Sequence, residues 1–164
     1  MRRSQFMRGA VLAATVVLAG ACGADPDTAR AAAEPEIFSL HWPAEQLATD
    51  VRMCVIAATG ETIALDPDPI VGLAHVDSAY LADPADDFVT VRWTPHGRAT
   101  LAAATAQRIG ERLAIVIEDE VVELPVINQS LDIEALPLMP MQSSAAAEAL
   151  AARIRDAAAA RRGG

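Results

Sequence analysis

Three histidines carry the side chains best suited to acid–base or metal chemistry in this sequence. His41, His75 and His96 lie far apart along the chain, without the close spacing that brings two imidazoles to one metal ion. No serine occupies a GxSxG elbow, where a nucleophile would be exposed on a sharp turn. Catalysis would require the fold to bring one histidine beside a distant carboxylate such as Asp66 or Asp77. The sequence therefore predicts a non-catalytic protein and leaves an enzyme of unrecognised type as an alternative.

Carboxylates and thioethers offer two further kinds of metal ligand. Asp66 and Asp68 lie in Asp-Pro-Asp-Pro, which lacks the additional oxygen ligands of a calcium-binding loop and is typical of a turn. Met53, Met139 and Met141 carry the soft sulfur that Cu(I) prefers, although packing is the commoner role of methionine. We therefore expect no cofactor and no metal centre, and a small-ligand or metal-binding module is a second alternative.

Cys22 ends a segment with the marks of an export signal. Three arginines within the first eight residues precede an uncharged apolar run over residues 10–21, which is too short to span a bilayer. The residues before the cysteine are small and resemble the lipobox of bacterial lipoproteins, with Ala19 where leucine is commoner. We predict a signal peptide over residues 1–21 and lipid attachment at Cys22. Ordinary secretion with cleavage nearby is the alternative.

A lipid on Cys22 would fix where the protein works. Each buried methylene adds about 0.8 kcal/mol of membrane affinity, so acyl chains such as palmitate would hold the chain on a membrane surface. The predicted location is the extracytoplasmic side of the cell envelope, in the periplasm or at the outer membrane if the cell is Gram-negative, since Gly23 rather than an aspartate follows the cysteine. Cys54 is then the remaining thiol, and its apolar surroundings predict a buried, unreactive side chain.

The net charge of the chain indicates which classes of partner it can bind. It has 13 basic residues, all of them arginine, against 22 acidic residues, and its formal net charge is −9. Nucleic-acid binding needs clustered positive charge, so we expect no nucleic-acid partner. The sequence predicts contact with the membrane through the N-terminal lipid and contact with another protein through the folded part.

The rest of the chain suits a single domain on a flexible tether. Residues 22–35 are small, polar or proline-containing and have no helical or strand period, so we expect a lipidated tether there. The domain is predicted over residues 36–160. The last residues, 161–164, are expected to form a disordered tail.

The first half of the domain has three strand candidates, over residues 37–42, 51–58 and 73–81. Residues 44–50 fit either one helical turn or a loop. The stretch 61–73 holds the two Asp-Pro pairs, and each proline disfavours helix in the residue before it. This stretch is therefore predicted to be a turn or loop.

The second half begins with the most regular pattern in the sequence. Residues 89–93 alternate apolar with polar side chains, as in a strand with one buried face. Thr94 is suited to cap a helix that begins at Pro95 and ends at Gly110. The apolar stripe expected on this helix has a member every four residues: Leu101, Thr105 and Ile109.

A hairpin is predicted after this helix. Residues 113–117 are continuously apolar, as in a central strand covered on both faces. Three acidic residues at 118–120 form a polar connection, for which solvation of an exposed turn is the ordinary explanation. The second arm covers residues 121–127, and Pro125 predicts a bulge or an edge position because proline cannot donate to a ladder.

The C-terminal part is predicted to be a short edge strand and a helix. Residues 136–141 are apolar but contain two prolines, and Ser143 or Ser144 can cap the helix that follows. The predicted fold class is α+β, with a mixed, mainly antiparallel sheet and two main helices packed on it. The apolar stripe expected on the last helix is Ala147, Leu150, Ala151, Ile154 and Ala158.

The pattern from Val91 onward resembles the head of the first periplasmic domain of the SecD protein-export family, here in a lipoprotein-like chain. The similarity covers roughly residues 60–156 and includes the strand pattern around Ser78. The matching positions in the strand, helix and hairpin are Val91, Gly97, Thr105, Gly110, Leu113, Ala114, Ile115, Val116, Val121 and Pro125. Those in the last helix are Ala147, Leu150, Ala151, Ile154 and Arg155.

This resemblance implies an α+β head whose surface contacts exported polypeptides, and it links the chain to protein export. The sequence departs from the family at Asp119, in place of a hairpin glycine, and at Glu123 and Leu124, in place of two small residues. Pro140 and Ala146 are further departures. We therefore take Asp119, Glu123 and Leu124 as the candidate surface for a polypeptide or envelope partner.

Overall fold

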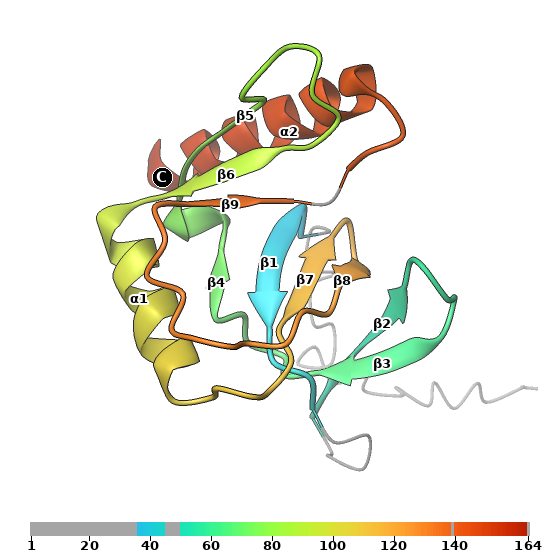
Figure 1. The fold of residues 1–164 in the computed structure, drawn as a ribbon, viewed down its shortest axis with the longest axis vertical. Helices are drawn as coiled ribbons and strands as arrows, with labels where there is room; N and C mark the ends of the chain where they lie inside the picture. Colours follow the sequence, from blue (N-terminus) through green and yellow to red (C-terminus); the bar gives the residue numbers. More distant parts are fainter. Residues whose placement is uncertain (1–35, 45–49, 139, 164) are drawn as a thin grey trace, which may run out of the picture. The chain divides into compact units, whose positions relative to one another are not determined.

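The computed structural model describes residues 36–44, 50–138 and 140–163, which form two β-sheets and two long helices (Figure 1). The predicted signal peptide, the lipid site at Cys22 and the tether lie outside these residues. So do most of the stretch 44–50 and Met139.

The larger sheet has six strands in the order β3-β2-β8-β7-β1-β4. These strands are β1 (Phe38–His41), β2 (Arg52–Ile56), β3 (Thr62–Leu65), β4 (Val71–Gly72), β7 (Ala114–Ile117) and β8 (Glu120–Glu123). Neighbouring strands are antiparallel except β2 and β8, whose parallel register pairs Val55 with Glu120 and Ile56 with Val121. The predicted central strand is β7, which is buried along its whole length between β8 and β1.

The smaller sheet has the order β5-β6-β9 and carries the C-terminal helix. Its strands are β5 (Val76–Tyr80), β6 (Thr90–Trp93) and β9 (Ala135–Pro137). The helices are a short 3-10 turn, η2 (Leu73–His75), with α1 (Pro95–Ala106) and α2 (Ser144–Gly163). Helix α2 runs along β5 (Figure 1). The α+β class with mainly antiparallel pairing is confirmed, with the strands divided between two sheets.

Helix α1 begins as predicted but ends earlier. The Thr94 hydroxyl accepts a hydrogen bond from the Gly97 amide at 3.0 Å, and Pro95 is the first helical residue. The helix stops at Ala106, so the prediction that it continues to Gly110 is wrong. Gly110 has a φ of +93° and its amide donates to the Ile127 carbonyl at 2.7 Å, because the chain has already left the helix to pair with the hairpin arm. The predicted stripe residue Ile109 is consequently 59% exposed.

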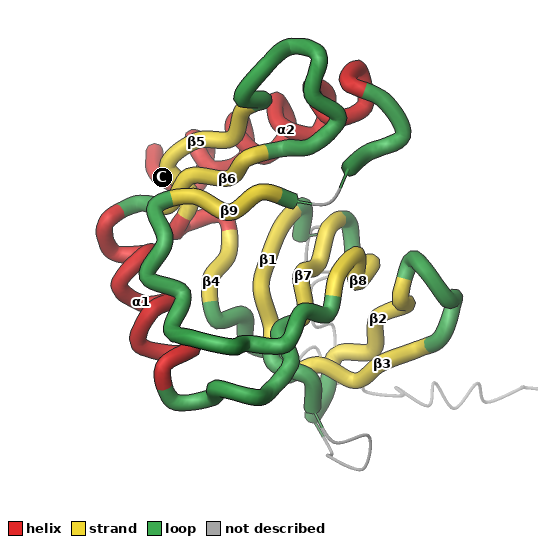
Figure 2. Tube along the Cα trace, in the orientation of Figure 1, coloured by secondary structure: helices red, strands yellow, loops and turns green. Residues whose placement is uncertain are grey.

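The connection between β8 and β9 passes beside α1 (Figure 2). Side-chain hydrogen bonds hold it there. The buried Thr105 hydroxyl donates to the Leu101 carbonyl at 2.7 Å and accepts from the Leu131 amide at 2.9 Å. The Ser130 hydroxyl donates to the Ala102 carbonyl at 2.9 Å. These bonds fix the long irregular segment that follows β8.

The β7–β8 hairpin turns sharply at its acidic tip. Glu118 and Asp119 both have positive φ, 52° and 68°, as in the primed two-residue turns that match strand twist. Ile115 pairs with Glu123 and Val116 with Val121, which leaves Val122 as an extra residue in a β-bulge. The predicted bulge thus lies at Val122, whereas Pro125 has the predicted edge position, since its carbonyl bonds to Leu113 on one side and the pairing with β2 on the other side ends at Val121.

Two strands lie where the sequence predicts a loop. Within 61–73, residues 62–65 form β3 and residues 71–72 form β4. The prolines restrict only the turn between these strands, and β3 pairs with β2 through a hairpin in which Gly60 adopts a φ of +73°. The strand predicted from residue 73 starts at Val76, because residues 73–75 form η2.

Helix α2 buries the whole predicted stripe but is longer than predicted. All five stripe residues are buried. The disordered tail predicted from residue 161 is not observed, since the helix continues to Gly163. Arg162 donates to the carbonyls of Val76 and Asp77, the latter at 3.0 Å, and these bonds hold the last turn on β5.

The larger sheet has apolar side chains on both faces. One face packs with the smaller sheet and both helices into the main core, where the Phe38 and Trp93 rings are 5.8 Å apart. The opposite face carries a smaller cluster: Cys54, Leu65, Ala114, Val116 and Val121. Alternate residues of β7 therefore serve different clusters, as the continuous apolar run predicts.

Candidate functional site

The three histidines do not form one site. His75 and His96 come together, with stacked rings 5.5 Å apart, and burial together with the neighbouring imidazole lowers the pKa of His75. His41 lies separately on β1. No group of three or more His, Cys, Asp and Glu side chains able to hold a metal ion occurs within the described ranges.

His41 forms a buried pair with Ser39 on one face of β1. The Ser39 Oγ and His41 Nε2 atoms are 2.9 Å apart, and His41 Nδ1 is 2.8 Å from the backbone carbonyl of Asp66. A carbonyl can only accept, so Nδ1 donates and Nε2 is free to accept the serine proton. Such a pair could serve as nucleophile and base, but both side chains are fully buried, so no substrate can reach them.

Arg52 connects this buried pair to the hairpin tip. Its guanidinium donates to the Glu36 carboxylate at 3.1 Å and also forms an ion pair with Asp119. Burial raises the pKa of Glu36, but the polar side chains of His41 and Ser39 and the hydrogen bond from Arg52 outweigh it and leave the pKa below its usual value. The network therefore stabilises ionised Glu36 and holds Asp119 in an ion pair with Arg52.

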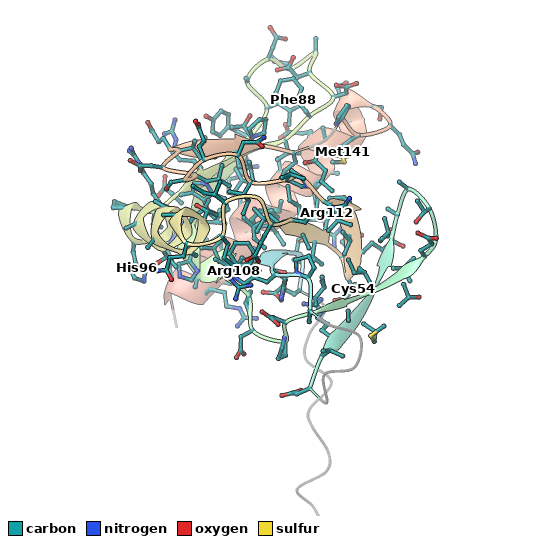
Figure 3. The ribbon with its side chains drawn as sticks, turned by 60° about the horizontal axis from the view of Figure 1, so that its bottom comes forward. Cys54, Phe88, His96, Arg108, Arg112 and Met141 are labelled. Atoms are coloured by element: carbon teal, nitrogen blue, oxygen red, sulfur yellow. The ribbon has the colours of Figure 1, made fainter. Side chains whose placement is uncertain are left out.

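The predicted soft ligands are also dispersed. Cys54 is buried, and burial raises the pKa of its thiol, which keeps it protonated and unreactive. Met53 is 54% exposed on β2, whereas Met141 is half-buried against the main core beyond β9. Cys54, His96 and Met141 lie on separate elements (Figure 3).

A small pocket lies between the start of β1 and η2. Glu36, His75 and Arg161 are among its lining residues, and its volume is about 160 Å³. Sites for drug-sized ligands occupy roughly 300 Å³ or more. This pocket is suited to water or a small ion.

Two apolar grooves meet at Pro125. The first, which we call the β8 groove, has a volume of about 400 Å³ and is lined by Ile56, Ala58 and residues 122–125. The second has a volume of about 340 Å³ and is lined by Leu113, Pro125 and residues of the connection after β8. Val126, which lines it, is 47% exposed. Together they form an apolar surface large enough for several side chains of a polypeptide.

The β8 groove exists because β2 ends before β8 does. The parallel pairing stops at Ile56 and Val121, with one more bond from the Ala57 amide to the Val121 carbonyl. The chain then turns towards β3, while β8 and its extension continue to Pro125. A gap is left beside residues 122–125.

The three residues predicted as a partner surface, Asp119, Glu123 and Leu124, do not lie at one place. Glu123 and Leu124 line the β8 groove, whereas Asp119 lies at the hairpin tip in its ion pair with Arg52. Burial raises the pKa of Glu123. Sequence reasoning missed Ile56, Ala58 and Val122 as groove residues, since no local pattern reveals that β2 pairs with β8.

Comparisons with known proteins agree with this fold. The model of the SecDF P1 head subdomain family matches residues 46–160, well over half of the chain. The search of curated proteins found no match. Among the described residues, no helix has both the length and the apolarity needed to cross a membrane.

Two solved structures of SecDF are similar in fold. A crystal structure of its super-membrane-facing form matches with a TM-score of 0.58 and 21% identity, covering 74% of this chain and 19% of that one. A structure of SecDF as a membrane component that enhances protein export gives a TM-score of 0.57 and 20% identity, covering 74% and 62%. The chain thus spans less than two thirds of either SecDF chain, and the family match identifies it as a member of the SecDF P1 head subdomain family.

Proposed function

We propose that this chain is a non-catalytic, lipid-anchored domain on the extracytoplasmic side of the cell envelope, where it binds unfolded polypeptides in protein export. Membership of the SecDF P1 head family supports the link to export. The β8 groove carries the proposal, because it offers apolar walls beside a strand that β2 leaves unpaired. Extended polypeptides commonly bind in this way, by adding to a sheet edge and placing side chains in adjacent pockets.

The location follows from the N-terminal segment. An apolar run after three arginines and a lipobox-like sequence before Cys22 support export and acylation. The lipid would keep the head at a membrane surface, where a polypeptide emerging from a translocon is locally concentrated.

A non-catalytic role fits the one Ser–His pair that the described residues form. Ser39 and His41 are fully buried, and the hydrogen bond to the Asp66 carbonyl holds the imidazole in the interior. These groups therefore contribute to the stability of the sheet, and binding is assigned to the β8 groove.

Photo-crosslinking of the full chain tests polypeptide binding. A photo-reactive amino acid is placed at position 122 or 124 in the groove, or at position 148 on the exposed side of α2 as a control. The probe is one model protein in two forms, native and permanently unfolded by reduction and alkylation. We expect adducts with the unfolded form at positions 122 and 124, and few with the native form.

Equal labelling at position 148 would show that the contact is non-specific. Absence of adducts with the unfolded probe at both groove positions would overturn the proposal. Circular dichroism of each labelled protein confirms that the head is folded.

A further inference from the structure

The extension of β8 presents free backbone groups to the β8 groove. The Pro125 carbonyl accepts from the Leu113 amide at 2.9 Å, so it faces β7. Backbone groups of an extended chain alternate in direction, and the amide and carbonyl of Leu124 therefore face the opposite side. Neither group bonds to the backbone of any described residue. This edge is ready to pair with another extended segment.

Glu123 gives this edge a negative charge. Arg52 bonds to Glu36 and Asp119, and Arg153 pairs with Glu118, so these two arginines of the region around the hairpin are engaged elsewhere. No ion pair among the described residues includes Glu123. Its carboxylate is partly buried, and this burial raises its pKa. An incoming cation would relieve that cost.

We propose that the β8 groove binds one extended client segment as an added strand along Leu124, with an arginine or lysine of that segment against Glu123. This inference rests on the proposed polypeptide-binding function and adds a preference for sequence. Main-chain hydrogen bonds to Leu124 can form with a segment of any sequence, whereas the Glu123 carboxylate favours a segment with a positive charge.

The size and polarity of the groove define the segment. Residues 122–125 span about 13 Å when extended, which is room for four residues of an added strand. Apolar side chains flanking the basic residue would contact Ile56, Val122 and Leu124. An acidic residue at the same place would face Glu123 across a partly desolvated gap and be rejected.

Peptide binding to the full chain in detergent tests the inference. Three dye-labelled heptapeptides carry valine and leucine around a central arginine, its neutral analogue citrulline, or glutamate. Fluorescence anisotropy should show the arginine peptide binding about fivefold more tightly than the citrulline peptide, and the glutamate peptide most weakly. Glu123→Gln should abolish the arginine preference. Glu148→Gln, on the exposed side of α2, should retain it.

A fourth peptide tests strand addition. Methylation of a central backbone nitrogen removes one main-chain donor and should weaken binding tenfold or more. Equal affinity for arginine and citrulline peptides, or a preference that survives Glu123→Gln, would overturn the charge assignment while crosslinking of unfolded polypeptide still stands. If neither the peptides nor the unfolded model protein binds, the proposed function itself fails.

Discussion

Arg52 is the residue on which the polar network of the larger sheet depends. One side chain bonds to Glu36 near the start of β1 and to Asp119 at the tip of the β7–β8 hairpin, and it lies 3.4 Å from the His41 ring. Arginine can serve several acceptors at once because its guanidinium is a fork of five donors. Removing it would leave Glu36 partly buried without its cation.

Arg52→Gln should lower the free energy of unfolding by about 2 kcal/mol at neutral pH. Glu36 has a depressed pKa in the folded state, so its stabilising contribution is present above the ordinary glutamate pKa of 4.5 and is lost as the pH falls through the folded value. The difference between wild type and variant, measured by urea unfolding, should shrink on acidification. Arg98→Gln breaks the exposed 2.6 Å pair with Asp132 and should cost much less, because solvent screens that pair.

Glu123→Gln should make the isolated protein more stable at neutral pH. Burial raises the pKa of Glu123, so the ionised carboxylate destabilises the fold once the pH rises through the folded value. The gain should be below about 1 kcal/mol because the group is still partly hydrated. Urea unfolding from pH 4 to pH 8 should show the gain vanish as the pH falls below 4.5, the unperturbed value. A Glu123→Gln variant that is less stable at pH 8 would contradict this.

At the scale of elements, the position of α1 depends on close packing of its first turn against η2. A Cβ on Gly97 would lie 2.5 Å from the His75 carbonyl oxygen, a distance at which the backbone must shift. Gly97 therefore lets the first turn of α1 lie against η2, and it also donates to the Thr94 cap.

Gly97→Ala should destabilise the protein by more than about 2 kcal/mol, although alanine normally favours a helix over glycine by about 1 kcal/mol. Thermal unfolding measures the change. The control is Ala99→Gly on the exposed side of the same helix, which should cost no more than about 1 kcal/mol. A stabilising Gly97→Ala would show that α1 and η2 are not in close contact.

The sequence predicts those elements whose signals are local. Thr94 and Pro95 mark the start of α1, the alternation at 89–93 marks β6, and the stripe of α2 is buried as expected. The predicted end of α1 is wrong because the Gly110 amide donates to the carbonyl of Ile127, which lies beyond the hairpin and leaves no local signal at Gly110. Likewise β3 is short and becomes a strand through its partner β2.

The candidate site likewise combines residues that the local sequence reveals with features that depend on distant parts of the chain. Glu123 and Leu124 attract notice as departures from a family pattern, and the structure places both in the β8 groove. Asp119 attracts notice for the same reason, yet its ion pair with Arg52 depends on a strand more than fifty residues earlier. The open edge beside Leu124 depends on where β2 ends, which no local pattern encodes.

At the scale of the whole molecule, we expect the folded head and the N-terminal segment to have separate roles. The two sheets and both helices share one core, whereas the predicted lipid site lies outside the described residues. The head should therefore fold and bind without the lipid, and the lipid should decide only its location.

Cys22→Ala should move the protein from the membrane fraction to the soluble fraction of the envelope, because the acyl anchor is removed. Fractionation followed by immunoblotting measures this. The soluble variant should retain the unfolding free energy of the wild-type head. A Cys22→Ala protein that still sediments with membranes would contradict the lipoprotein assignment, whereas Cys54→Ala should leave the distribution unchanged.

The parallel pairing of β2 with β8 also has a consequence for the order of folding. The β2–β3 hairpin is complete early in the chain, but its place in the sheet is beside a strand that follows α1. Such high contact order slows folding, since a long loop must close before the pairing forms. In the export that we propose, β2 and β3 would emerge from the N-terminal side before β7 and β8 and would lack their place in the sheet until that hairpin follows. The emerging chain would then itself need protection.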